Sequence, residues 1–152
     1  MSSVKSLALA IELATQKRDQ AGKSLVQAQR AYLEGENQLQ QLQTYSAETA
    51  SKWAAGAKTL TSPELLRHHY QFMERLQQAI DMQTQVIGDL DRRVEAAKKV
   101  ALDAEARLAG LKQVLKKKQA EHARTQARRE QRQTDEMAAL LHRRVAASGE
   151  RL

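Results

Sequence analysis

The sequence predicts an all-α protein, built as a long antiparallel two-helix coiled-coil hairpin with a projecting C-terminal helical extension. Three observations carry this prediction: few aromatic residues, many helix-forming residues, and regularly spaced apolar residues. Of the 152 residues only 3% are aromatic, 28% are charged and one is proline. A compact core of this size normally depends on large aromatic side chains. A chain rich in Ala, Leu, Gln, Glu, Lys and Arg is instead typical of long helices.

The first predicted helix spans about residues 3–55. Along it apolar residues recur at alternating steps of three and four, and only Arg18 and Gly35 interrupt the series. The series is Val4, Leu7, Ile11, Ala14, Arg18, Ala21, Leu25, Ala28, Tyr32, Gly35, Leu39 and Leu42. A stripe that persists through about six seven-residue repeats predicts a helix that supercoils around a partner.

The second predicted helix spans about residues 63–147 and carries a stripe of the same kind. Its members are Met73, Leu76, Ile80, Gln83, Ile87, Leu90, Val94, Ala97, Ala101, Ala104, Leu108, Leu111 and Leu115. Only Gln83 is polar, so this helix too should bury one face along most of its length.

A turn at about residues 56–62 separates the two helices. Gly56 suits the left-handed residue that often ends a helix. Ser62 can cap the second helix, with Pro63 in the first turn, where its missing N–H costs nothing. A single short break of this kind favours an antiparallel hairpin, and we expect residues 1–152 to form a single coiled-coil domain.

Folding the chain about residue 59 or 60 pairs residues whose numbers sum to about 119. Val4 then faces Leu115, so the two stripes begin and end at the same level. Gly35 lies near Gln83, so the two weak positions of the stripes meet and predict a locally loose layer. This agreement between two independent stripes favours the hairpin over separate helices.

Residues 116–147 should overhang, because the first helix has no residues left to pair with them. From Lys116 onward there are ten basic and five acidic residues, so this stretch carries +5 of the net charge of +7. Such a helix can enter an acidic or polar partner, or it can simply be a helix kept in solution by its charge. Nucleic-acid binding is not expected, because no aromatic residue is interleaved with the basic ones to stack on bases.

The aromatic residues gather toward the turn. They are Tyr32, Tyr45, Trp53, Tyr70 and Phe72. We interpret them as side chains that cap the end of the hairpin. A two-helix hairpin can hide only one stripe per helix, however, so several rings should remain partly exposed. Exposed aromatic residues are enriched where proteins bind proteins.

The sequence gives no sign of catalysis, and we expect no enzyme, cofactor, metal or small-molecule substrate. It has no cysteine, and its six glycines are too dispersed for a phosphate-binding loop. His68 and His69 are adjacent and point in different directions on a helix, so they do not have the spacing of metal ligands. No apolar run approaches the roughly 18 residues of a membrane span, and the run from Leu7 to Leu13 is interrupted by Glu12. The expected location is the cytoplasm.

Three ordered motifs carry a family resemblance. They are Leu39-x-x-Leu42-x-x-Tyr45, then Tyr70-x-Phe72-x-x-x-Leu76-x-x-Ala79-Ile80-x-x-Gln83 after the turn, and finally Arg129-Glu130-Gln131-x-x-x-Asp135-Glu136. In their order and spacing the chain resembles the FliJ-type proteins of bacterial flagellar type III export. The length, the two-helix architecture and the basic extension agree along nearly the whole chain.

The resemblance implies a rod-like component of the flagellar export apparatus that resembles the central stalk of rotary ATP synthases. Its implied partners are the hexameric export ATPase, the cytoplasmic part of the membrane export gate, and the chaperones of export substrates, which it escorts. The implied location is the cytoplasm at the inner membrane, beneath the flagellar basal body. ATP turnover would belong to the partner.

The resemblance also implies two binding surfaces. The surface for the export gate would comprise Gln38, Leu42, Tyr45, Phe72, Leu76 and Ala79. Thr49 and Gln83 stand at neighbouring positions where the family pattern has an aromatic residue and a histidine, which leaves the margins of this surface open. The surface for the ATPase ring would comprise Val4, Leu7, Ile11, Leu108, Leu111, Leu115, Lys116, Lys117 and Lys118.

Two alternatives from other classes remain open. A structural coiled-coil oligomer would pair its overhang with another copy through Ala120, Ala123 and Ala127. A basic nucleic-acid-binding helix protein would show an affinity that falls steeply with salt.

Overall fold

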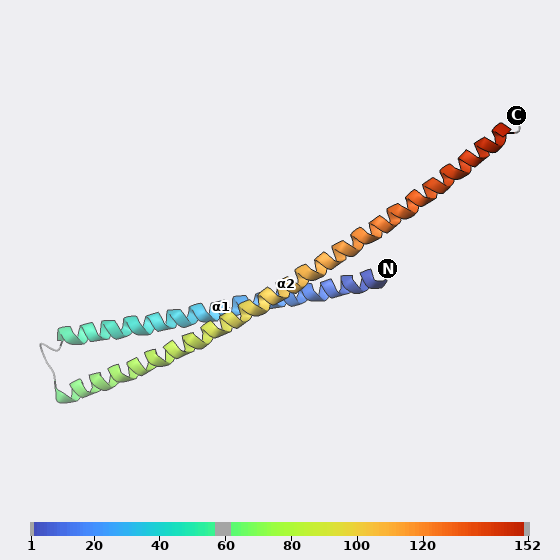
Figure 1. Ribbon diagram of the computed structural model, residues 1–152. Helices are drawn as coiled ribbons and strands as arrows, with labels where there is room; N and C mark the ends of the chain where they lie inside the picture. The colour runs from blue at the N-terminus through green and yellow to red at the C-terminus, as the bar shows by residue number, and fades with distance from the viewer. Residues whose placement is uncertain (1, 57–61, 151–152) are drawn as a thin grey trace. The chain divides into compact units, whose positions relative to one another are not determined.

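The computed structural model describes residues 2–56 and 62–150. These residues form two α-helices, α1 (Ser2–Gly56) and α2 (Pro63–Glu150), which run antiparallel (Figure 1). The predicted all-α hairpin is thereby confirmed. Residues 57–61, which make up most of the predicted turn, lie outside the described residues.

The chain divides into two compact units, and each takes a stretch from both helices. One unit is Gln16–Glu105, and the other joins Met1–Thr15 to Ala106–Leu152. In the first unit α1 and α2 lie side by side (Figure 1). The assignment of residues 1–152 to a single domain stays a prediction.

The two predicted stripes form the buried seam of each unit. Every stripe residue of α1 and α2 is buried or half-buried. The most buried side chains are Ala21, Leu76, Ile80 and Val94 in Gln16–Glu105, and Ala14 and Leu108 in the other unit. Alanine allows two helix backbones to approach closely, so a narrow seam of Ala and Leu replaces the aromatic core of a globular domain.

The start of α2 is capped as the sequence predicts. The Ser62 hydroxyl oxygen accepts a hydrogen bond from the Leu65 backbone N–H at 3.2 Å, which satisfies one of the N–H groups left without a partner at a helix start. α1 ends at Gly56, as the sequence predicts, but the expected left-handed conformation of this residue is wrong, because no glycine of the described chain has a positive φ.

Two polar residues, Arg18 and Gln83, interrupt the seam, and they are accommodated in different ways. Arg18 is half-buried, and its guanidinium turns out of the seam to pair with Asp19 at 2.9 Å and Glu105 at 4.0 Å. The long stem of an arginine can pack against apolar neighbours while its charge stays in water. Ion pairs this exposed contribute little stability.

Gly35 and Gln83 meet, as the pairing arithmetic predicts, but the layer that they form is not loose. The Gln83 side-chain amide donates hydrogen bonds to the Gly35 carbonyl oxygen at 2.9 Å and to the Gln38 side-chain oxygen at 3.3 Å. A Cβ atom added to Gly35 would lie 2.9 Å from the Leu90 Cδ1 atom. Gly35 therefore lets α2 approach the backbone of α1 closely, and this approach brings the Gln83 amide within hydrogen-bonding distance of the Gly35 carbonyl oxygen.

Candidate partner-binding surfaces

Tyr45 of α1 and Phe72 of α2 are the centre of the surface expected for the export gate. Their rings meet edge to face, with centroids 6.0 Å apart and planes at 79°. Both remain exposed, Tyr45 by 52% and Phe72 by 40%. The contact fixes two aromatic side chains from different helices beside one another while leaving much of their area to solvent, which suits a protein-binding anchor.

The other expected gate residues differ in their exposure. Gln38 is exposed, and the hydrogen bond from Gln83 holds its side chain. Leu42 and Ala79 are half-buried, and Leu76 is only 8% exposed. Leu76 therefore belongs to the seam, where its side chain holds the helices together and has little area to offer a partner.

Near the ends of the helices, Trp53 of α1 stacks on His69 of α2. Their ring planes are 3° apart and their centroids 4.1 Å apart. The His69 ring also contacts Tyr70, with centroids 5.8 Å apart. This stacking supports the interpretation that aromatic side chains cap the hairpin. The sequence reasoning considered His69 only as a metal ligand and missed this stack, although the numbers of Trp53 and His69 nearly satisfy the pairing arithmetic.

Tyr32 and Glu36 form a separate polar cluster on the hairpin. A hydrogen bond with the Glu36 carboxylate raises the pKa of Tyr32 above the usual value of 10.0, and desolvation adds to the rise. The negative charges of Glu36 and of Asp91, on α2, act in the same direction. The phenol is thus kept neutral as a hydrogen-bond donor.

The surface expected for the ATPase ring lies in the unit of Met1–Thr15 and Ala106–Leu152. Its apolar members all lie in the seam: Val4, Leu7, Ile11, Leu111 and Leu115 are half-buried, and Leu108 is buried. Lys116, Lys117 and Lys118 are exposed. The lysines are thus the members of this set whose side chains are free to meet a partner.

The basic stretch that follows is helical and open to solvent. All side chains from Lys116 to Gly149 are exposed. At its start, Ser3 and Val4 of α1 line a groove of about 560 Å³ with residues of α2 as far as Gln126. The residues of α2 that line this groove with Ser3 and Val4 lie beyond Leu115, the partner that the pairing arithmetic gives Val4.

Two features of other functional classes are not found in the described part of the chain. In residues 2–56 and 62–150, no three His, Cys, Asp or Glu side chains gather closely enough to hold a metal ion. Neither helix, over its described length, has a stretch that is long and apolar enough to cross a membrane.

Comparison with known proteins finds a family whose model matches the chain and a solved structure with a similar fold. The model of the family described as "Flagellar FliJ protein" matches residues 3–147. A solved structure described as a YscO homolog from Chlamydia trachomatis is similar, with a TM-score of 0.69 and 16% sequence identity. The similarity covers 94% of this chain and 93% of that chain, and it shows a shared fold. No curated protein matches the sequence.

Proposed function

The chain belongs to the FliJ family of flagellar proteins, and from this premise we propose that it links the flagellar export ATPase to the export gate and escorts the chaperones of export substrates. The family makes it a protein associated with flagellar type III export. The observation that carries the finer proposal is the exposed aromatic pair of Tyr45 and Phe72. Tyr and Phe are enriched at protein interfaces, and Tyr is among the residues that most often carry the binding energy.

The export gate binds at Tyr45 and Phe72, with Gln38 beside them and Leu42 and Ala79 contributing their exposed edges. Leu76 acts indirectly, because its burial sets the separation of the helices on which the two rings stand. The partner on this surface is the cytoplasmic part of the gate membrane protein. The protein therefore works in the cytoplasm at the inner membrane, beneath the flagellar basal body.

The test of the gate surface compares three variants that keep the seam intact. Tyr45→Ala and Phe72→Ala should each weaken binding to the purified cytoplasmic domain of the gate at least tenfold, as measured by calorimetry. Tyr70→Ala is the matched control, because Tyr70 is 65% exposed and outside the surface. Circular dichroism should show the same helicity for all three. Unchanged affinity of both surface variants, or an equal loss with Tyr70→Ala, would contradict the assignment.

The ATPase ring is engaged through the exposed lysines after the seam. Positive side chains on a helix favour an acidic surface, and Lys116, Lys117 and Lys118 lie together where the seam residues end. ATP turnover takes place in the ring, and this chain biases it by contact.

Charge reversal tests this second contact. Lys117→Glu with Lys118→Glu should abolish stimulation of the purified ATPase, whereas Lys98→Glu with Lys99→Glu changes the net charge equally and should leave stimulation intact. If both double variants lose stimulation equally, the effect is one of net charge alone. If neither loses stimulation, the lysines do not contact the ATPase.

A structural coiled-coil oligomer is the second candidate. The observation in its favour is an exposed apolar face near the end of α2, formed by Met137, Leu140, Leu141 and Val145. Sedimentation at dilute concentration separates the two candidates. An elongated monomer supports the export proposal, and a stable oligomer that Leu140→Gln dissociates supports the structural one.

A further inference from the structure

The two edges of the seam in Gln16–Glu105 have opposite character. Along one edge, within residues 17–45 and 72–100, six of the ten residues at seven-residue intervals are apolar, and we name them the apolar flank: Ala31, Tyr45, Phe72, Ala79, Val86 and Val100. The other four positions hold Lys17, Ser24, Gln38 and Arg93. The other edge carries Glu36, Gln77, Thr84, Asp91, Lys98 and Glu105. Charged residues of the polar edge have partners within the hairpin, because Arg18 pairs with Glu105 and Tyr32 interacts with Glu36 and Asp91.

The apolar flank is not covered by the described chain. Val86 is 45% exposed and Val100 58% exposed, in addition to Tyr45 and Phe72. Isolated exposed apolar residues are ordinary, but a row that recurs at seven-residue intervals, with Arg93 as its one interruption on α2, is a widened apolar face. In coiled coils of two strands this position is usually charged.

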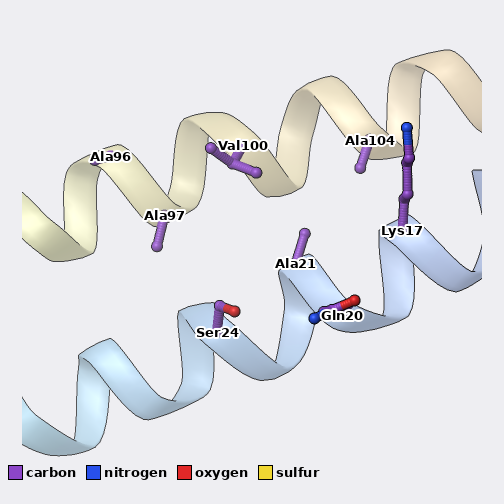
Figure 2. Close-up of a pocket in the computed structure, with 8 residues that line it drawn as sticks. All are labelled: Lys17, Gln20, Ala21, Ser24, Ala96, Ala97, Val100 and Ala104. Carbon is purple, nitrogen blue, oxygen red and sulfur yellow. The ribbon is translucent and has the colours of Figure 1, made fainter.

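A groove accompanies the flank where the seam is built of alanine. It has a volume of about 520 Å³. Ala21 of α1 and Ala97 and Ala104 of α2 point into the space between the helices, and Val100 stands at its side (Figure 2). Lys17 extends from α1 toward α2 at one end of the same groove (Figure 2).

The repeat of the flank identifies the kind of segment that can cover it. From Phe72 to Val100 the flank residues of α2 follow a seven-residue period that only Arg93 interrupts, over roughly 42 Å of helix. A strand or an irregular loop cannot match this period over such a length, whereas a third helix in a coiled coil matches it at every repeat.

The charges on the flank select the partner. Within residues 17–45 of α1 and 72–100 of α2, the charged residues at the same seven-residue positions are Lys17 and Arg93, and neither forms an ion pair with any residue that the structure describes. A second copy of this chain would bring the same two cations to the contact and carries a net charge of +7. An acidic helix would instead pair with both cations.

We propose that the apolar flank binds an amphipathic helix of an acidic partner protein, laid along the seam as a third strand of the coiled coil. Small apolar side chains of that helix enter the alanine groove, and its carboxylates meet Lys17 and Arg93. The proposal goes beyond the gate surface, because Lys17, Val86, Arg93 and Val100 are outside it.

The experiment uses the full chain and two designed helical peptides of 28 residues. The peptides share an Ala and Leu stripe at seven-residue spacing, and one has Glu and the other Lys beside the stripe. Fluorescence anisotropy should show binding of the Glu peptide at least tenfold tighter than that of the Lys peptide. Val86→Gln with Val100→Gln should weaken it at least tenfold, and Lys17→Glu with Arg93→Glu should reverse the preference between peptides.

The matched control is Thr84→Gln with Lys98→Gln, on the polar edge of the same helix. It should leave peptide affinity within twofold of the parent. Equal binding of both peptides, or equal loss in the control, would overturn the proposal. Dimerisation abolished by Val86→Gln with Val100→Gln would assign the flank to a second copy instead. Gate binding tested with Tyr45→Ala and Phe72→Ala is a separate readout, so either proposal can fail alone.

Discussion

The stretch Gln16–Glu105 and the stretch from Lys116 to Gly149 are both helical, yet the helices have different support. In the first, each helix buries one stripe against the other, and Leu76, Ile80 and Val94 are among its most buried residues. In the second, every side chain is exposed. The comparison shows that one chain can obtain the same secondary structure from tertiary packing in one region and from local preferences in another.

The exposed stretch has the composition that local preferences require. It is dominated by Ala, Gln, Arg, Lys and Glu, which are strong helix formers. Gln131 donates a hydrogen bond to Asp135 at 3.2 Å, one turn away. None of the ion pairs of the described residues lies in this stretch. Its stability is therefore the sum of small local terms, and we expect its amide protons to exchange faster than those of the seam.

The largest expected effect comes from truncating leucines on the two sides of this comparison. Leu108 is 2% exposed and Leu141 is 60% exposed. Leu108→Ala should lower the free energy of unfolding by about 2–5 kcal/mol, because it removes buried contacts and leaves a cavity. Leu141→Ala should change it by less than about 0.5 kcal/mol. Urea unfolding followed by circular dichroism measures both. Similar losses for the two variants would mean that Leu141 is buried in solution.

The seam could be predicted from the sequence because its pattern is long and redundant. One interruption such as Arg18 does not hide a stripe that has apolar residues on both sides, and two independent stripes fixed the pairing of Gly35 with Gln83. The hydrogen bonds of that layer could not be predicted in this way. In the apolar pattern Gln83 is only an interruption. In the structure its side-chain amide donates a hydrogen bond to the Gly35 carbonyl oxygen, which is accessible because glycine has no side chain.

The binding surfaces were less accessible to sequence reasoning, for a physical reason. A family resemblance assigns a binding role to residues by their position in a motif. It does not distinguish the side chains that contact a partner from those that pack between the helices. Leu76 illustrates this, because it stands among the expected gate residues and is buried in the seam. The stack of Trp53 on His69 depends on side-chain orientation, which no spacing rule contains.

A smaller difference should separate two glutamines, one in each region. Gln83→Ala removes the bonds to Gly35 and Gln38 and should cost about 1 kcal/mol, the usual net value of a hydrogen bond. Gln131→Ala removes a bond within one exposed helix. It should cost about 0.5 kcal/mol or less, because alanine is the better helix former. Urea midpoints at equal slope give the two values, and a larger cost for Gln131→Ala would invert the comparison.

Two glycines of α1 sharpen the contrast between seam and surface. A Cβ atom added to Gly22 meets nothing within 4 Å, whereas one added to Gly35 would lie 2.9 Å from Leu90. Gly22→Ala should stabilise the protein by about 0.5–1 kcal/mol through helix propensity. Gly35→Ala gains the same propensity but crowds the seam, so it should be about 1 kcal/mol less stable than Gly22→Ala. Thermal unfolding of both variants checks this. Equal stabilisation would show that Leu90 moves aside freely.

The smallest effect concerns Tyr32, the aromatic residue of the seam stripe of α1. The hydrogen bond with Glu36 raises the pKa of its phenol, so folding favours the protonated form. The stabilisation is therefore complete below the usual pKa of 10.0 and is lost as the pH rises through the raised value. Glu36→Gln should move the pKa of Tyr32 back toward 10.0, because it removes the carboxylate that is the largest cause of the shift.

Tyrosinate absorbance isolates this titration when the curve of Tyr32→Phe is subtracted from that of the parent. The subtraction should give a midpoint above 10.0 in the parent and a lower midpoint in Glu36→Gln. Asp91→Asn should lower it less, since Asp91 acts only through its charge from the other helix. An unchanged midpoint in Glu36→Gln would mean that the cluster does not hold in solution. If only Asp91→Asn lowers the midpoint, the charge of Asp91 on α2 raises the pKa of Tyr32 more than the hydrogen bond with Glu36 does. That result would also show that the two helices pair at Tyr32.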